Sequence, residues 1–174
     1  MSINQSDILS SLRENLGGEA FDKVKRLFSL ISAENPNTEP EDIHHLDVFL
    51  LRISFCFYAE DAGLFAPNQF TSAISSFTQK DGCDLAAFFT RLFYVLSRPC
   101  DTNTRAVLQS QYTGFPYVNG TLFTSDAPVP ELSGSARSLL VECGALDWSE
   151  VDPAVFSSPL QPMIYTEQCI CTKE

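Results

Sequence analysis

Residues 46–59 read Leu-Asp-Val-Phe-Leu-Leu-Arg-Ile-Ser-Phe-Cys-Phe-Tyr-Ala, the most apolar stretch of the 174-residue chain. A helix built from this stretch has apolar side chains on every face, which is typical of a helix surrounded by protein. Upstream, Thr38 and Glu41 form a capping-box pattern, and downstream Gly63 can end the helix. The sequence therefore predicts a buried central helix over about residues 43–62.

Amphipathic spacing predicts further helices on both sides of this segment. An apolar stripe runs over residues 21–31, and a second lies within 68–78. Apolar residues over 85–96 follow the i, i+3, i+4, i+7 rule, and residues 136–143 form a later helix. The predicted fold class is mainly α, a helical bundle packed around the central helix.

A small β-hairpin is predicted near residues 115–123. This segment reads Phe-Pro-Tyr-Val-Asn-Gly-Thr-Leu-Phe, with Asn119-Gly120 between aromatic and β-branched residues. An Asn-Gly pair in such a setting is the strongest short-range hairpin signal, because both residues tolerate positive φ. We expect a short ribbon that packs on the helices.

The charge balance argues against direct binding of nucleic acid. Lys and Arg total 11 against 22 Asp and Glu, which gives a net charge of −11. Proteins that bind the phosphate backbone do so largely through Lys and Arg, which release counterions. The first residues have neither the basic patch nor the apolar core of a signal peptide, and the six cysteines form no C-x-x-C pair. The sequence therefore predicts a cytoplasmic protein with reduced thiols and no membrane span.

A search for reactive groups predicts no catalytic, cofactor-binding or metal-binding residue. His44 and His45 are adjacent on a helix, so their side chains point about 100° apart and cannot bind one ion together. Cys56 lies about 16 Å along the helix from His45, too far for a Cys–His pair. No Gly-x-Ser-x-Gly, no glycine-rich phosphate loop and no zinc-type cysteine spacing occurs.

Two carboxylates at the end of the central helix have two interpretations. Glu60 and Asp61 could share a raised pKa and act as an acid/base pair. The favoured interpretation is structural: one of them pairs with Arg52, Arg91 or Arg98, and the other faces water. The residues predicted to be structural are Arg52, Glu60, Asp61, Gly63, Asn119, Gly120 and Trp148.

Several segments taken together resemble one known family. Residues 55–65 (FCFYAEDAGLF) resemble the FCLFAEDTGIF signature of MmeI-like, type IIG/IIL single-chain restriction–modification enzymes. Residues 78–85 and 92–96 resemble the family's DG-x-DL and LFxVL blocks. Residues 115–123 resemble FPYVNGGLF, and residues 146–156 resemble DWSxIxPAIF. The order and spacing of these blocks agree across most of the chain.

The resemblance implies a non-catalytic helical spacer from an adenine-N6 DNA methyltransferase of bacterial defence. In that family the spacer lies between a nuclease domain and a methyltransferase domain that uses S-adenosylmethionine. The family's cofactor loop, its Asn-Pro-Pro-Tyr motif and its nuclease motif have no counterpart here, so activity of this chain alone is not expected. S-adenosylmethionine is implied for a parent or partner methyltransferase, and DNA is implied as an indirect partner.

The predicted organisation is a spacer-like domain over residues 1–156 and an irregular tail over 157–174 that departs from the family. A truncated or a split gene would give this pattern. Two alternatives remain open: an independent acidic binding protein, in the form of a DNA mimic acting on a nuclease or methyltransferase, and an enzyme in its own right. The −11 charge motivates the first of these.

Overall fold

The computed structural model describes residues 4–36, 39–99, 109–118 and 122–157, and it is helical. Within these residues no strand is present, so the prediction of a mainly α fold is confirmed. The helices are α1 (Gln5–Asn15), α2 (Gly18–Glu34), α3 (Pro40–Asp61), α4 (Gln69–Phe77), α5 (Leu85–Leu96), α7 (Ser110–Thr113), α8 (Gly134–Gly144) and α9 (Ala154–Ser157).

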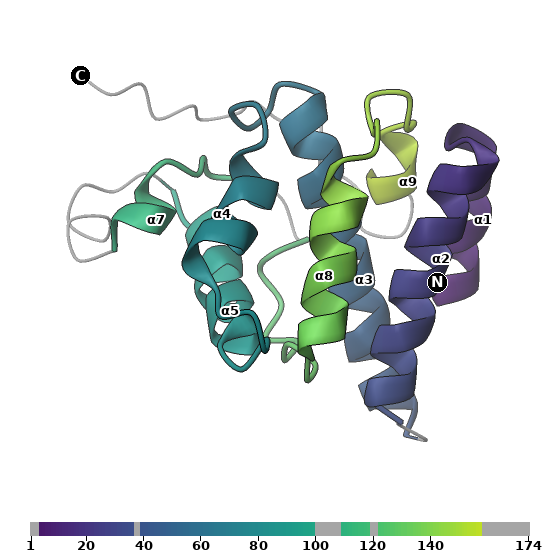
Figure 1. Ribbon diagram of the computed structural model, residues 1–174, viewed down its shortest axis with the longest axis horizontal. Helices are drawn as coiled ribbons and strands as arrows, with labels where there is room; N and C mark the ends of the chain where they lie inside the picture. The colour runs from purple at the N-terminus through teal and green to yellow at the C-terminus, as the bar shows by residue number, and fades with distance from the viewer. Residues whose placement is uncertain (1–3, 37–38, 100–108, 119–121, 158–174) are drawn as a thin grey trace.

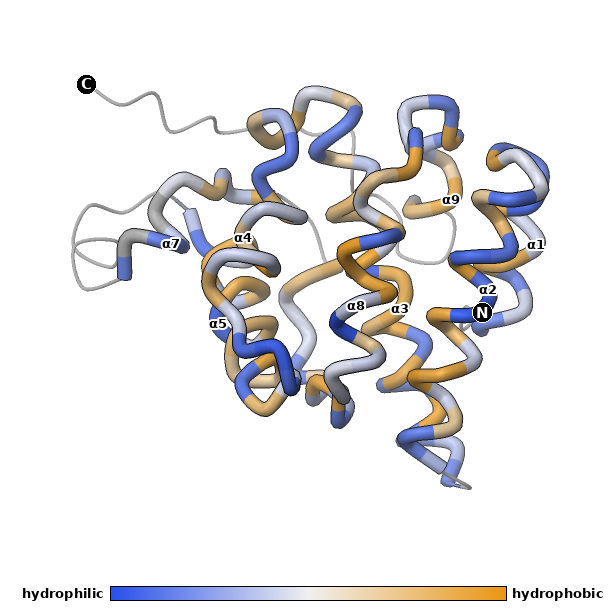
Figure 2. Tube along the Cα trace, viewed as in Figure 1, coloured by the Kyte–Doolittle hydropathy of each residue, from blue (hydrophilic) through white to orange (hydrophobic). Residues whose placement is uncertain are grey.

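Figure 1 shows the helices arranged in two groups that meet at α3 and α8. Helices α1 and α2 pack together on one side, and α4, α5 and α7 lie on the other. Helix α8 contacts both α2 and α4, so it joins the two groups although it comes late in the chain. In Figure 2 the hydrophobic stretches of α3, α5 and α8 lie toward the middle of the molecule.

Helix α3 begins at Pro40, three residues before the buried stretch predicted over about 43–62. Its N-cap is Glu39, with no side-chain hydrogen bond, and Pro40 occupies the first turn. Proline is favoured there because it has no N–H to leave unpaired and its φ is already helical. The carbonyl of Glu39 accepts the N–H of Ile43 at 3.1 Å, which sets the start of the helix. Thr38 lies outside the described residues.

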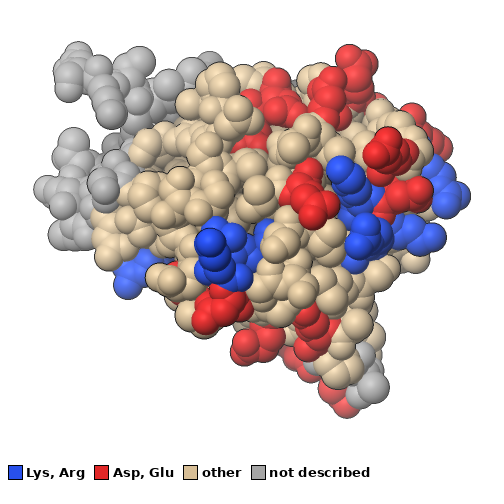
Figure 3. All heavy atoms as spheres, in the orientation of Figure 1, with Lys and Arg blue, Asp and Glu red and all other residues tan. Residues whose placement is uncertain are grey.

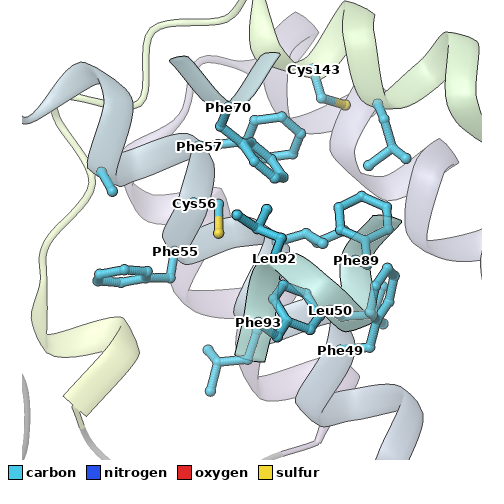
Figure 4. Packing of buried hydrophobic residues seen from close by; sticks show 14 of the residues in the cluster. Phe49, Leu50, Phe55, Cys56, Phe57, Phe70, Phe89, Leu92, Phe93 and Cys143 are labelled. Atoms are coloured by element: carbon cyan, nitrogen blue, oxygen red, sulfur yellow. The ribbon is translucent and has the colours of Figure 1, made fainter. Parts of the chain in front are cut away.

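Every side chain from Leu46 to Phe57 on α3 is buried. Aromatic contacts surround this part of the helix, as Figure 4 shows. Phe49 meets Phe89 of α5 edge-on at 5.4 Å between ring centroids, and Phe57 meets Phe70 of α4 at 5.2 Å. Burial of each such ring contributes about 1.5–3 kcal/mol, and a well-oriented pair adds about 0.5–1.5 kcal/mol. Helices α3, α4 and α5 therefore share one core.

The predicted β-hairpin near residues 115–123 is wrong. Its turn, at residues 119–121, lies outside the described residues, and the flanking residues 115–118 and 122–123 form no strand. Their backbone groups have other partners: the N–H of Val118 donates to the carbonyl of Leu96 at the end of α5, at 2.8 Å. The side chains of Phe115 and Phe123 are buried among the helices. Packing of these side chains on helices thus replaces cross-strand pairing.

No helix among the described residues combines the length and hydropathy that crossing a bilayer would need.

Candidate functional site

Arg52 connects the middle of α3 to the segment that precedes α8. Its Nε–H donates to the carbonyl of Leu122 at 2.8 Å, and Nη2 donates to the carbonyl of Ser125 at 3.0 Å and to its hydroxyl at 2.9 Å. The guanidinium carbon lies 5.2 Å from the ring centroid of Phe93 and 5.8 Å from that of Phe123. Arg52 thus fixes a loop through backbone carbonyls and two aromatic rings.

The expected pairing of an arginine with Glu60 or Asp61 is wrong. Within the part of the chain that the structure describes, the ion pair that occurs joins His45 to Glu41, at 4.0 Å. Eight positions separate Arg52 from Glu60, which is about 12 Å along a helix axis. Burial lowers the pKa of Arg52 to about 10, with the nearby Cys56 thiol acting in the opposite direction, so Arg52 stays charged near neutral pH.

Glu60 caps the start of helix α4. Its carboxylate accepts the N–H of Thr71 at 2.9 Å, and its second oxygen accepts the Thr71 hydroxyl. Asn68, the N-cap residue of α4, makes no side-chain cap bond, so Glu60 supplies an acceptor that this helix end otherwise lacks. Burial raises the pKa of Glu60, and the hydrogen bonds from Thr71 act against that rise.

Asp61 connects the end of α3 to the segment after α8. Its carboxylate accepts the backbone N–H of Trp148 at 2.8 Å. The indole N–H of Trp148 donates to the carbonyl of Cys143 at 2.9 Å, and the indole stacks on Phe57 with centroids 5.0 Å apart. Glu60 and Asp61, although adjacent, therefore hold two different segments against α3.

Gly63 forms the turn that ends α3. Its φ of +82° is a conformation that residues with a Cβ rarely adopt. The N–H of Leu64 donates to the carbonyl of Ala59 at 2.9 Å, the bond expected of a Schellman motif. Asn119 and Gly120, the other predicted turn residues, lie outside the described residues.

The segment over residues 122–133, called here the connecting segment, is held at its far end by the end of α2. Asn35 donates its side-chain amide to the carbonyl of Glu131 at 2.9 Å and accepts the N–H of Glu131 at 2.9 Å. Glu34 accepts the hydroxyl and the N–H of Ser133, the N-cap residue of α8. Nothing in the sequence pairs Asn35 with a residue 96 positions away.

Arg137 of α8 binds the end of α4. Its Nε–H donates to the Thr78 hydroxyl at 2.9 Å, and Nη2 donates to the carbonyl of Ser75 at 3.0 Å. A cation is favourable at a helix C-terminus, where carbonyl groups lack intrahelical partners. Sequence reasoning missed this role, although Arg137 is the single Lys or Arg between residues 106 and 172.

The described residues contain no arrangement that resembles a catalytic or metal site. No group of three His, Cys, Asp or Glu side chains among them could hold a metal ion. The rings of His44 and His45 are 6.4 Å apart between centroids and tilted. Cys56 is fully buried, and burial raises the pKa of its thiol, which disfavours the reactive thiolate.

Two of the larger hollows on the surface of the described part could hold a ligand. One, of about 290 Å³, lies between the last turn of α5 and residues 123–129 of the connecting segment, and Arg52 forms part of its wall. The other, of about 820 Å³, is a groove between α2 and α8. In Figure 3 acidic and basic side chains are intermixed, and the visible face has no regular row of carboxylates.

Comparison with known proteins gives consistent results from sequence and from structure. Residues 44–123 match the family model described as "MmeI, helicase spacer domain". DNA methyltransferase A of Bacillus subtilis (strain 168) is 38% identical to this chain over 150 residues, which is 86% of the chain. A solved structure of the type IIL restriction–modification enzyme MmeI in complex with DNA matches 79% of the chain, with a TM-score of 0.67 and 32% identity.

These relatives are much longer than this chain. The matched part spans 16% of DNA methyltransferase A and 18% of the MmeI chain. The similarity therefore concerns one region of each larger enzyme.

Proposed function

We propose that this chain, whose residues 44–123 match the family model of the MmeI helicase spacer domain, is a non-catalytic spacer of a restriction–modification DNA methyltransferase. In this role it holds the nuclease and methyltransferase domains in a fixed relative position. The observation that carries the proposal is that three polar side chains of α3, Arg52, Glu60 and Asp61, each bind a segment outside that helix.

These contacts favour a rigid body. Arg52 joins α3 to residues 70 and 73 positions later, and Asp61 joins it to a residue 87 positions later. A spacer can hold two neighbours in register only if its own ends do not move relative to one another. Buried hydrogen bonds to charged groups are stronger than bonds between neutral groups. These connections should therefore make the domain more rigid than side-chain packing alone would.

The proposal assigns methyl transfer to other parts of the enzyme. In support of this assignment, the described residues include no strand followed by a glycine-rich turn, an arrangement that commonly holds a nucleotide-like cofactor. In this proposal a methyltransferase domain outside the matched region binds the cofactor, and DNA is contacted through that domain.

A chimera of DNA methyltransferase A tests the positioning role. The segment of that enzyme which matches this chain is replaced either by this chain or by a flexible Gly/Ser linker of equal length. Transfer of labelled methyl groups to mixed-sequence DNA is then measured. The proposal expects the linker to lose most of the activity and this chain to restore it. A linker that supports activity equal to the native segment would contradict a positioning role.

The isolated chain provides the second test. Incubated with labelled S-adenosylmethionine and mixed-sequence DNA, it is expected to give background counts. Turnover by the chain alone would refute a non-catalytic role.

A further inference from the structure

The hollow beside Arg52 has features that a spacer role does not use. Its wall combines the last turn of α5 with residues 123–129 of the connecting segment, and it encloses about 290 Å³. That volume is several times larger than one water molecule, whose share of liquid volume is about 30 Å³. Arg52 forms the buried part of the wall, and Arg98 lies at its exposed edge.

Arg52, which lines this hollow, retains hydrogen-bonding capacity. The bonds it makes use Nε and Nη2, and among the described residues Nη1 has no hydrogen-bond partner. No carboxylate in the described part forms an ion pair with Arg52; its 3% exposed charge is met there by two carbonyls, a hydroxyl and two aromatic rings. Buried charges are normally paired, because removal from water is costly for the charged form. The lowered pKa of Arg52 reflects that cost.

Two further donors line the same hollow. The hydroxyl of Ser125 accepts a hydrogen bond from Arg52, which leaves its own proton available to a ligand. The guanidinium of Arg98 lies over the ring of Tyr94 at 4.9 Å and forms no ion pair with a described residue. Stacking on the ring orients the guanidinium while leaving its N–H groups available at the ring's edge.

Asp126 is the acidic side chain in the wall. It is exposed, and within the described residues it pairs with neither Arg52 nor Arg98. Its charge opposes binding of an anion, but as a solvated group it is screened more than the buried Arg52.

We propose that the hollow formed by Arg52, Arg98 and Ser125 binds an oxyanion, with phosphate as the ligand group. Arg98 suits this chemistry because a planar guanidinium fork can donate two parallel hydrogen bonds to two oxygens of a phosphate. Arg52, whose Nε and Nη2 already have partners, can add bonds from Nη1. The acidic surface elsewhere disfavours a long polyanion, so a small phosphate-bearing molecule is the favoured source. This inference is independent of the spacer role.

The test uses the full 174-residue chain and inorganic phosphate as the probe. Isothermal titration is performed at constant ionic strength, with chloride replacing phosphate in the reference. The proposal expects saturable binding by the wild type. Arg98→Gln should weaken binding by about tenfold, as expected for loss of one charge-assisted bond. Asp126→Asn should tighten it. Arg91→Gln, an exposed arginine on α5 outside the hollow, serves as the matched control and should bind as the wild type does.

The outcomes separate clearly because all three altered side chains are exposed and the variants should fold. Absence of saturable binding, or equal effects of Arg98→Gln and Arg91→Gln, would overturn the proposal. A short oligothymidylate at the same phosphate concentration distinguishes the sources. If the oligothymidylate binds more tightly than phosphate and its binding depends on Arg98, the occupant of this site is a backbone phosphate. If the oligothymidylate binds more weakly than phosphate, the occupant is a free phosphate group.

Discussion

The carboxylate of Asp61, the last residue of α3, accepts the backbone N–H of Trp148 at 2.8 Å across 87 positions of sequence. The acceptor is a carboxylate and the bond is partly buried, so loss of this hydrogen bond should reduce the stability of the whole domain. We predict that Asp61→Asn lowers the free energy of unfolding by about 1–2 kcal/mol, as expected for a hydrogen bond to a charged group. Urea titration followed by the fluorescence of Trp148, the single tryptophan, measures the change.

Asp22→Asn is the matched control for that experiment, since Asp22 is exposed on α2. We expect a change within about 0.5 kcal/mol, which is usual for surface substitutions. Equal losses of stability in the two variants would show that the hydrogen bond from Trp148 to Asp61 does not stabilise the fold.

Arg52 should be the most sensitive charged residue. Arg52→Met keeps much of the apolar volume but removes the bonds to Leu122 and Ser125, and leaves the buried carbonyl of Leu122 without its donor. We predict a loss of about 1–3 kcal/mol in unfolding free energy, because the buried carbonyl of Leu122 is left without a hydrogen-bond donor. Arg91→Met, an exposed substitution on α5, should stay within about 0.5 kcal/mol.

A second measurement tests whether the loss of stability in Arg52→Met arises in the connecting segment. Limited proteolysis under native conditions should cleave the connecting segment faster in Arg52→Met than in Arg91→Met. Unchanged cleavage there would contradict the role assigned to Arg52 in holding that segment.

Glu60 should give stability a distinct dependence on pH. Its folded pKa is raised above the usual 4.5, chiefly by burial. A carboxyl with a raised folded pKa binds protons more tightly when folded, so its contribution is present below about pH 4.5 and is lost as pH rises through the folded pKa. We predict that Glu60→Gln gains stability relative to wild type across that window. Urea titrations at a series of pH values check this, and a constant difference between the two proteins would contradict it.

Gly82 and Gly63 form a matched pair for testing a close backbone approach. Both have positive φ, +77° and +82°. A Cβ on Gly82 would lie 2.6 Å from the backbone carbon of Ser133, whereas one on Gly63 would have no neighbour within 4 Å. We predict that Gly63→Ala costs about 1–2 kcal/mol from backbone strain alone, and that Gly82→Ala costs clearly more. Equal costs in thermal or urea unfolding would show that the contact near Gly82 relaxes freely.

The helices could be predicted where one apolar face was continuous. The stripe over residues 85–96 corresponds to α5 (Leu85–Leu96), and the prediction over 136–143 lies within α8 (Gly134–Gly144). In these segments the spacing that defines a helix is the same spacing that buries its side chains.

Helix α1 was missed although it carries a local signal. Asn4 and Asp7 form a reciprocal capping box, and Ile8 and Leu12 are buried one turn apart. The local pattern is short, since Ile8 and Leu12 are the buried residues of this helix. Its stability comes from packing against α2 and α3, which no local pattern reports.

The polar contacts could not be predicted for a different reason. The need of Arg52 for a partner was evident from its apolar neighbours, but any carboxylate or carbonyl could meet it. The partners chosen, Leu122 and Ser125, depend on where the connecting segment crosses α3. That crossing is decided by long-range packing, and the Asn-Gly signal at residues 119–120 pointed to a hairpin instead.

The contact between Arg52 and Leu122 also has a kinetic consequence. The chain between them must close a loop of 70 residues before the bond can form, which costs conformational entropy ahead of any gain. Contacts among α3, α4 and α5 close much shorter loops and can form earlier. Weakening the Arg52 bond should therefore raise the unfolding rate and leave the folding rate nearly unchanged. Stopped-flow mixing into and out of denaturant measures the two rates.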